Sequence, residues 1–414
     1  MSGDEEKLPR LRNVDVIQLA LEGRPAVGLR DPLQLSDMMV CVGQEALPVL
    51  ARLDGLHSMR DLQWELTRNS GRLVFTDSVQ EMLDRLDEAF LLENERFREA
   101  LQRKVVEYRK SPFRPSSHAG LSYSDDTETL TSDLNGFFTG PGGPGTPEYF
   151  SQDRRPKGLV APHIDIRSGG ACFAHGYHAL ASGKPSDLYV IFGTGHAGVA
   201  DLFSATSLDF QTPLGTVRTD RDFLRELSDS LGQDACAEEL LHATEHVIEF
   251  QIVFLQHVFG GRHNFEVVPI LVSLSPLFFD SASGFEAQKA HVKNFCNAVK
   301  EACRKTSKSV CFIASADLDH IGPRYGDGFQ PSRGMVSEAL EKDREMIGHL
   351  EKLNVAGFID HALRENDSQR ICGFSPITAM LHCMDASSGH LLDLDYAEVD
   401  DQKSFVSFCS VVFY

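Results

Sequence analysis

Residues 158–414 alternate short apolar runs with stretches of helical periodicity, and this alternation narrows the possible folds more than any other feature of the chain. The apolar runs, which are rich in β-branched and aromatic residues, lie at 158–162, 188–192, 265–272, 310–314 and 405–414. The helical stretches between them lie at about 223–231, 247–259, 287–303, 336–353 and 376–384. This order predicts an α/β domain with a central sheet buried between helices on both faces.

The first 108 residues predict a separate small module. Two short strands, at 14–21 and 26–29, flank the turn signal at 22–25. Three helices are expected after them, near 37–53, 58–67 and 76–90. Two strands and three helices favour a winged-helix-like module, which would serve for binding or docking.

Residues 109–157 differ in composition from both neighbours. They are rich in Ser, Gly, Pro and Asp and include the segment GPGGPG at 140–145. Such a stretch indicates a linker, although its aromatic residues would allow part of it to pack on the next domain as a lid. We therefore expect a module at 1–108, a linker or lid at 109–157 and a larger domain at 158–414.

Charge and cysteine usage exclude several classes of protein. The chain has 40 Lys and Arg against 60 Asp and Glu, a formal net charge of −20, which disfavours nucleic acid or an anionic membrane as partner. We expect no transmembrane helix, because no run of about 18 apolar residues occurs. The N-terminal residues lack the apolar core of a secretory leader. The nine cysteines are scattered without a CxxC pair, which is typical of the reducing cytoplasm.

Polar residues follow three of the predicted strands at the point where each strand ends. His163 comes after the run at 158–162, His196 after the run at 188–192, and Asp317 and His320 after the run at 310–314. The carboxyl ends of strands in an open α/β sheet form the edge at which ligands bind. We therefore expect these four side chains to line one functional site.

His163 and His196 are candidate metal ligands, because imidazole binds Zn, Cu, Fe and Ni. The spacing leaves the third ligand open among Asp165, Asp317, Glu245, His246, His320 and Cys372. Glu245 and Glu249 have a simpler interpretation as charges at the start of a helix. Cys372 precedes Gly373 and a predicted helix, a position that lowers the pKa of a thiol and lets the backbone approach a neighbour closely.

Six segments, in this order, resemble the Memo family, whose bacterial and archaeal members are also called AmmeMemoRadiSam system protein B. The segments are APHID at 161–165, FGTGH at 192–196, EHVIEFQ at 245–251, VPIL at 268–271, SADLDH at 315–320 and ICGFSPI at 371–377. The resemblance covers about residues 156–414. The first domain also resembles, faintly, peptide-binding modules of the PqqD type.

The resemblance implies a fold similar to that of LigB-type class III extradiol dioxygenases. It also implies a metal held by His163, His196 and Cys372, with Asp317 and His320 lining the pocket. A thiolate in place of the carboxylate of the dioxygenases favours softer metals such as Cu(I) or Zn, and iron also remains compatible with it. Among these ions, we expect iron or copper rather than zinc. Activity does not follow from the fold alone.

The chain departs from the commoner pattern of the family at two places. Many members read Ala-Gly-Tyr after the first histidine, where this chain reads Ile164-Asp165-Ile166, so a pocket tyrosine is lost and a carboxylate is gained. The usual His-His pair is His196-Ala197 here. These differences leave the substrate open.

Two functions are compatible with these observations. The first is a metal-dependent oxidoreductase in which His320 and Asp317 act as acid and base or orient the substrate. The second is a non-catalytic binding protein that uses the same pocket for a metal, a small molecule or a peptide. The family resemblance implies AMMECR-type and radical SAM proteins as partners in either case.

Overall fold

The computed structural model describes residues 7–21, 24–280, 282–364 and 369–414. The chain divides into two compact units, Met1–Ser111 and Pro112–Tyr414. The expected turn at 22–25 lies partly outside the described residues. Within the described part of the chain, no helix combines the length and the apolar character needed to cross a membrane. All nine cysteines lie in the described ranges, and each is a free thiol.

The first unit is a three-stranded antiparallel sheet followed by helices. Its strands pair in the order β1-β2-β3. Its elements are β1 (Asp15–Leu21), β2 (Arg24–Arg30), β3 (Met39–Gly43), the 3-10 turn η1 (Gln44–Ala46), α1 (Leu47–Leu50), α2 (Met59–Ser70), α3 (Thr76–Glu88) and α4 (Glu95–Arg109). Helix α2 begins at a capping box, in which Ser58 and Asp61 satisfy each other's backbone N–H groups. Apolar residues of α2 and α3, such as Leu62, Val79 and Leu86, are completely buried in the core of this unit.

The prediction of a helix near 37–53 is wrong for the first half of this range. Residues Met39–Gly43 form β3, which pairs along its whole length with β2. Val40 is buried in this sheet, so pairing with β2 outweighed the weak helical periodicity of a short segment. Helix α4 was not expected from the sequence.

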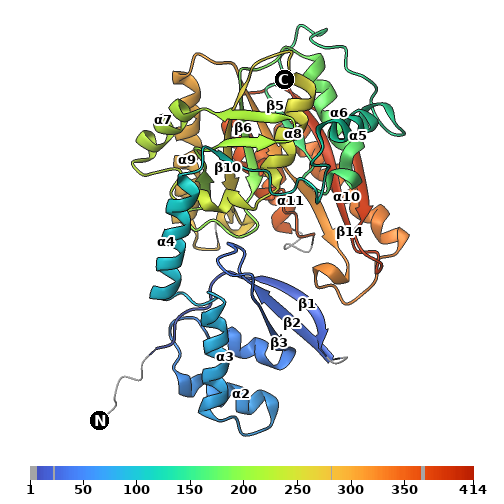
Figure 1. Cartoon of the computed structure of the whole chain (residues 1–414). Coiled ribbons are helices and arrows are strands. Elements are labelled where there is room, and N and C mark those ends of the chain that lie inside the picture. The colour runs from blue at the N-terminus through green and yellow to red at the C-terminus, as the bar shows by residue number, and fades with distance from the viewer. Residues whose placement is uncertain (1–6, 22–23, 281, 365–368) are drawn as a thin grey trace. The chain divides into compact units, whose positions relative to one another are not determined.

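The second unit is built on a large mixed sheet. The central strands β5 (Gly158–Ala161), β11 (Val310–Ser315), β6 (Leu188–Thr194) and β10 (Glu266–Val272) are parallel neighbours in this order. The remaining strands extend the sheet on both sides: β14 (Phe405–Phe413), β12 (Asp317–Ile321) and β13 (Gly389–Glu398) beyond β5, and β7 (Phe203–Ala205), β9 (Gly215–Thr219), β8 (Asp209–Thr212) and β4 (Phe113–Arg114) beyond β10. Figure 1 shows this sheet between helices.

Helices cover both faces of the sheet, which confirms the predicted α/β architecture with a central sheet flanked by helices. On one face lie α5 (Thr127–Thr139), α6 (Ile166–Ser182) and α8 (Val247–Phe259). On the other lie α7 (Arg221–Leu231), α9 (Glu286–Lys305), α10 (Arg333–Glu351), α11 (Val355–Arg364) and α12 (Phe374–Cys383). The short 3-10 turns η2 (Glu239–Ala243), η3 (Pro276–Phe279) and η4 (Pro323–Tyr325) connect them.

The strands alternate their side chains between the two faces. Tyr189 and Ile191 of β6 enter the core under α6 and α8, whereas Val190 and Phe192 enter the core under α9 and α12. All four are buried, because a central strand has no solvent face. The apolar runs in the sequence therefore reflect burial on both sides.

Part of the stretch expected as a linker or lid at 109–157 is regular structure. Strand β4 joins the sheet by pairing with β8, and α5 buries Leu130, Leu134 and Phe138 in the core shared with α6 and α8. Asp126 caps the start of α5 by accepting the N–H of Thr129. These residues belong to the compact unit Pro112–Tyr414.

Candidate metal centre

Three neighbouring parallel strands end at the same level of the sheet and carry the candidate residues into one place. Ala161 of β5 and Gly193 of β6 both pair with Ser315 of β11. His163, His196 and Asp317 follow these positions by two or three residues. The topology brings them together because parallel strands present their carboxyl ends at one edge.

His163 is buried, and its ring is held in one orientation. Its Nδ1 lies 3.0 Å from the carbonyl oxygen of Ser315, which can only accept a hydrogen bond. Nδ1 therefore carries a proton, and Nε2 is the nitrogen that faces Cys372, with 3.1 Å between Nε2 and Sγ. The backbone N–H of His163 donates to Asp317 at 2.8 Å.

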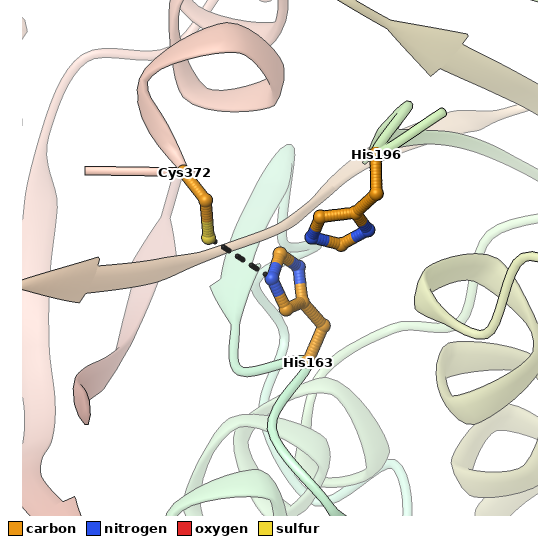
Figure 2. A group of neighbouring side chains, drawn as sticks. All are labelled: His163, His196 and Cys372. Carbon is orange, nitrogen blue, oxygen red and sulfur yellow. Dashed lines mark hydrogen bonds between the residues drawn. The ribbon is translucent and has the colours of Figure 1, made fainter. Parts of the chain in front are cut away.

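His196 is oriented by a carboxylate. Its Nδ1 lies 3.2 Å from both carboxylate oxygens of Glu245, and its backbone N–H donates to Glu245 Oε2 at 3.1 Å. A carboxylate behind a histidine fixes the ring and raises its basicity, as it does for many metal ligands. Figure 2 shows the rings of His163 and His196 and the sulfur of Cys372 converging from separate segments.

Cys372 sits just before α12 in a tight backbone arrangement. The N–H of Gly373 donates to the carbonyl oxygen of Asp317 at 2.9 Å, and the Thr194 hydroxyl donates to the carbonyl of Cys372 at 2.9 Å. A Cβ on Gly373 would lie 2.4 Å from the Asp317 oxygen. Glycine is therefore required next to Cys372 for this close approach to Asp317.

The charges around Cys372 favour its thiolate form. Burial alone would raise the pKa of the Cys372 thiol, but His163, His320 and His196 hold the pKa well below its usual value. Burial would lower the pKa of His163, but Cys372 and Asp317 raise that pKa to about 9. The thiolate is the form of cysteine that binds metals, so the sulfur is prepared for this role.

These three residues lie beside a cavity of about 840 Å³. This is enough for a small organic molecule. His320 lines it, with Nδ1 at 3.0 Å from the carbonyl oxygen of Leu318, and so does the buried Asp317. An apolar wall is formed by Ile164, Val399 and Val406.

The other candidate ligands lie in different surroundings. Asp165 lines the cavity, caps the start of α6 and pairs with Arg167. Glu245 and His246 lie beside His196, and His246 also lines the cavity. Glu249, the other acidic residue at the start of α8, is completely buried and accepts hydrogen bonds from the backbone N–H groups of Ser117 and His118.

Several residues of the cavity lining were not expected from the sequence, among them Tyr325 and Arg370. Tyr325, on η4, lines the cavity with its ring edge-on to His320 at 4.9 Å between centroids. Arg370 lines it as well and donates to the carbonyl oxygen of His320 and the carboxylate of Asp327. Tyr325 lies outside the six motifs, and Arg370 directly precedes the motif at 371–377, so its position next to Cys372 was the one signal that could have indicated it.

The donor atoms fit a metal ion. One ligand atom from each of His163, His196 and Cys372 lies within 4.8 Å of the others. The Nδ1 atoms of both histidines point to oxygen acceptors, so the remaining nitrogens can turn to an ion. Two imidazoles and one thiolate form a donor set that suits copper, iron or zinc.

Comparison with known proteins agrees with this architecture. A family model described as Memo-like protein matches residues 114–412. A MEMO1 family protein of Aquifex aeolicus is 28% identical over 391 residues, which cover 93% of this chain and 95% of that protein. MEMO1 family proteins of Methanosarcina acetivorans and Methanopyrus kandleri are each 30% identical, over 70% and 71% of this chain and 93% and 96% of their own lengths.

Proposed function

Because this chain belongs to the Memo family, and because two histidines and a cysteine converge beside a cavity, we propose that it is a metal-dependent oxidoreductase with His163, His196 and Cys372 as ligands. One observation carries the proposal. The sulfur of Cys372 lies 3.1 Å from Nε2 of the buried His163, and the imidazoles around this thiol favour its thiolate form.

We propose iron or copper rather than zinc, because the donor set suits all three ions and only iron and copper are redox-active. Thiolate is a soft ligand and imidazole a borderline one, a combination that suits these redox-active ions. A bound iron or copper ion would supply electron transfer to or from a molecule in the cavity. The fold similarity to class III extradiol dioxygenases is in keeping with redox chemistry but does not carry their reaction over.

The protein's own residues would bind the substrate and handle its protons. We propose His320 as the acid or base. Its Nδ1–H donates a hydrogen bond to the carbonyl oxygen of Leu318, so Nε2 is the nitrogen that would accept or release a proton. Asp317 accepts the backbone N–H of His163 and so orients this ligand. The apolar wall would exclude water from one side of the substrate.

The first test is the metal content of protein purified without oxygen, compared with His163→Ala and Cys372→Ser. We expect the wild type to hold about one iron or copper ion whose binding depends on His163 and Cys372. Changes behind a metal ligand already weaken binding about 10- to 100-fold, so loss of a ligand should cost more than about 100-fold.

The control is Cys41→Ser, which removes a thiol from the first unit and should leave the metal content unchanged. Turnover of O₂ or peroxide by the loaded wild type would support the enzymatic role. A wild type that takes up neither iron nor copper would contradict the proposed site.

A binding or adaptor role is the second candidate, and a feature of the first unit favours it. Large apolar side chains are exposed there: Leu56 (72%), Trp64 (60%), Leu73 (72%) and Phe75 (65%). We propose that these side chains form a surface that meets a partner, as contiguous exposed apolar patches do. In this second proposal, the first unit recruits AMMECR-type or radical SAM proteins in the cytoplasm. The pocket then holds a metal ion but catalyses no reaction.

A further inference from the structure

A second set of ligand atoms lies next to the first and does not include the cysteine. Nδ1 of His196 is 3.2 Å from Glu245 Oε1, and Nδ1 of His246 is 3.0 Å from the same oxygen. One ligand atom from each of the three residues lies within 4.8 Å of the others. We propose that His196, Glu245 and His246 form a second metal-binding position, suited to a divalent ion such as Fe²⁺, Mn²⁺, Co²⁺ or Zn²⁺.

Two of the three separations between these ligand atoms match what one ion requires, and the third is at most 4.8 Å. Ligand atoms about 2.1 Å from a common ion are separated from one another by about 3.0 to 3.4 Å. The two measured separations between Glu245 Oε1 and the imidazole nitrogens fall in this range. An ion can therefore take the place of the protons that these groups now share.

The position is both rigid and reachable. The Glu245 carboxylate also accepts the backbone N–H groups of His196 and His246, and Arg114 donates to the Glu245 carbonyl oxygen at 2.7 Å. The rings of His196 and His246 are nearly parallel, with 5.3 Å between centroids. Their side chains are 43% and 29% exposed, and both line the 840 Å³ cavity.

The charge of Glu245 also favours a cation here. Its side chain is only 8% exposed. Among the residues that the structure describes, no lysine or arginine lies within ion-pair distance of its carboxylate, and its only such partners are His196 and His246. A divalent ion that replaces the imidazole protons would supply positive charge next to this nearly buried carboxylate.

The second position differs in chemistry from the proposed sulfur-containing site. Two imidazoles with one carboxylate bind harder ions than two imidazoles with one thiolate. The two sets share His196, but the second does not require the first to be filled.

The test is to remove two ligands of the sulfur-containing site, His163 and Cys372, and to measure whether the protein still binds a metal ion. We expect the double variant His163→Ala/Cys372→Ser to bind about one Co²⁺ per chain, with an absorption spectrum that lacks thiolate-to-cobalt charge transfer. Adding His246→Ala to it should lower the affinity for Co²⁺ more than about 100-fold, because a ligand is lost. Adding His390→Ala instead, an exposed histidine outside the cavity lining, should leave binding unchanged.

Circular dichroism and thermal melting establish that each variant is folded. If the double substitution prevents folding, Cys372→Ser with and without His246→Ala gives the same comparison. The inference is overturned if the folded double variant binds no Co²⁺, or if the His246→Ala addition leaves binding unchanged. If the wild-type protein with Co²⁺ shows no thiolate-to-cobalt charge-transfer band, this contradicts the proposed sulfur-containing site but not the second position. Failure of the proposed function and failure of this inference therefore give different results.

Discussion

At the scale of single residues, hydrogen-bond acceptors decide which ring nitrogens are available. The carbonyl oxygens of Ser315 and Leu318 accept hydrogen bonds from the Nδ1–H groups of His163 and His320, and the carboxylate of Glu245 accepts one from Nδ1–H of His196. These acceptors can be matched to the histidines only in the folded chain. The same logic applies to a histidine away from the cavity, His242, whose Nε2 lies 2.9 Å from the carbonyl oxygen of Ser204.

His242 should make the protein less stable in mild acid. It is completely buried, and burial lowers its pKa from 6.5 to about 4. Below pH 6.5 the unfolded chain gains a proton that the folded chain does not, so this contribution to stability is present above pH 6.5 and is lost as the pH falls towards 4. Between pH 7 and 5.5 the loss amounts to roughly 1 kcal/mol.

His242→Gln keeps a side-chain N–H for Ser204 and removes this titration. Lowering the pH from 7 to 5.5 should reduce the free energy of unfolding of both proteins. We expect this reduction to be roughly 1 kcal/mol smaller in the variant than in the wild type. Urea unfolding at the two pH values measures it. His390→Gln, at an exposed position, is the control. An identical pH dependence in His242→Gln and wild type would refute the assignment.

At the scale of elements, α8 and the residues just before it connect four strands of the second unit: β6, β5, β11 and β4. Glu245 orients His196, just after β6. Gln251 donates to the Pro162 carbonyl after β5 and to the Ser315 hydroxyl at the end of β11. Glu249 forms a completely buried ion pair with Arg114 of β4. The acidic residues at 245 and 249 thus have tertiary partners, beyond the helix-terminal charge role that the sequence indicated.

The Arg114–Glu249 pair should be costly to break from one side only. Removal of one partner from a buried ion pair leaves an uncompensated charge and typically costs about 3 to 5 kcal/mol. We expect Arg114→Met and Glu249→Met each to lose this much stability, measured by urea unfolding, and the double variant to lose no more than either single variant. Arg218→Met, in an exposed pair with Glu266, should cost at most about 1 kcal/mol. Additive losses in the double variant would contradict this account.

At the scale of the whole molecule, the proposed metal centre belongs to one unit. Among the described residues, the proposed ligands, the cavity lining and the two large apolar cores all come from Pro112–Tyr414. The first unit has a core of its own. The proposed metal centre and the exposed apolar side chains therefore belong to different units of the chain.

A chain reduced to residues 112–414 should fold and bind metal with an affinity within about twofold of the full chain, because no ligand or core residue is lost. Thermal melting and metal content measure this. A cut at residue 158 should instead destabilise the protein, since it removes β4, α5 and the partner of Glu249. Equal stability of the two truncated chains would show that residues 112–157 are dispensable.

The sequence alone determined the α/β architecture and the edge of the sheet at which the candidate residues lie. Buried strands produce unbroken apolar runs, and residues that follow such runs must lie at the carboxyl edge of a parallel sheet. The family also followed from the sequence, because six motifs occur in order, and the match over residues 114–412 confirmed it. Local sequence patterns gave a wrong prediction at β3, because pairing with β2 decides its conformation. They also missed α5, because the polar composition of that segment indicated a linker although the helix is packed in the core.

Only the tertiary structure decided how the candidate residues are related to one another. Spacing left the partner of the two histidines open among six residues, and the fold brought Cys372 to 3.1 Å from His163 from a position 209 residues further along the chain. It also placed Glu245 and His246 against His196, and Tyr325 and Arg370 on the cavity wall. Distances of a few ångströms between distant segments depend on how loops pack over the sheet edge, and no local pattern in a sequence encodes them.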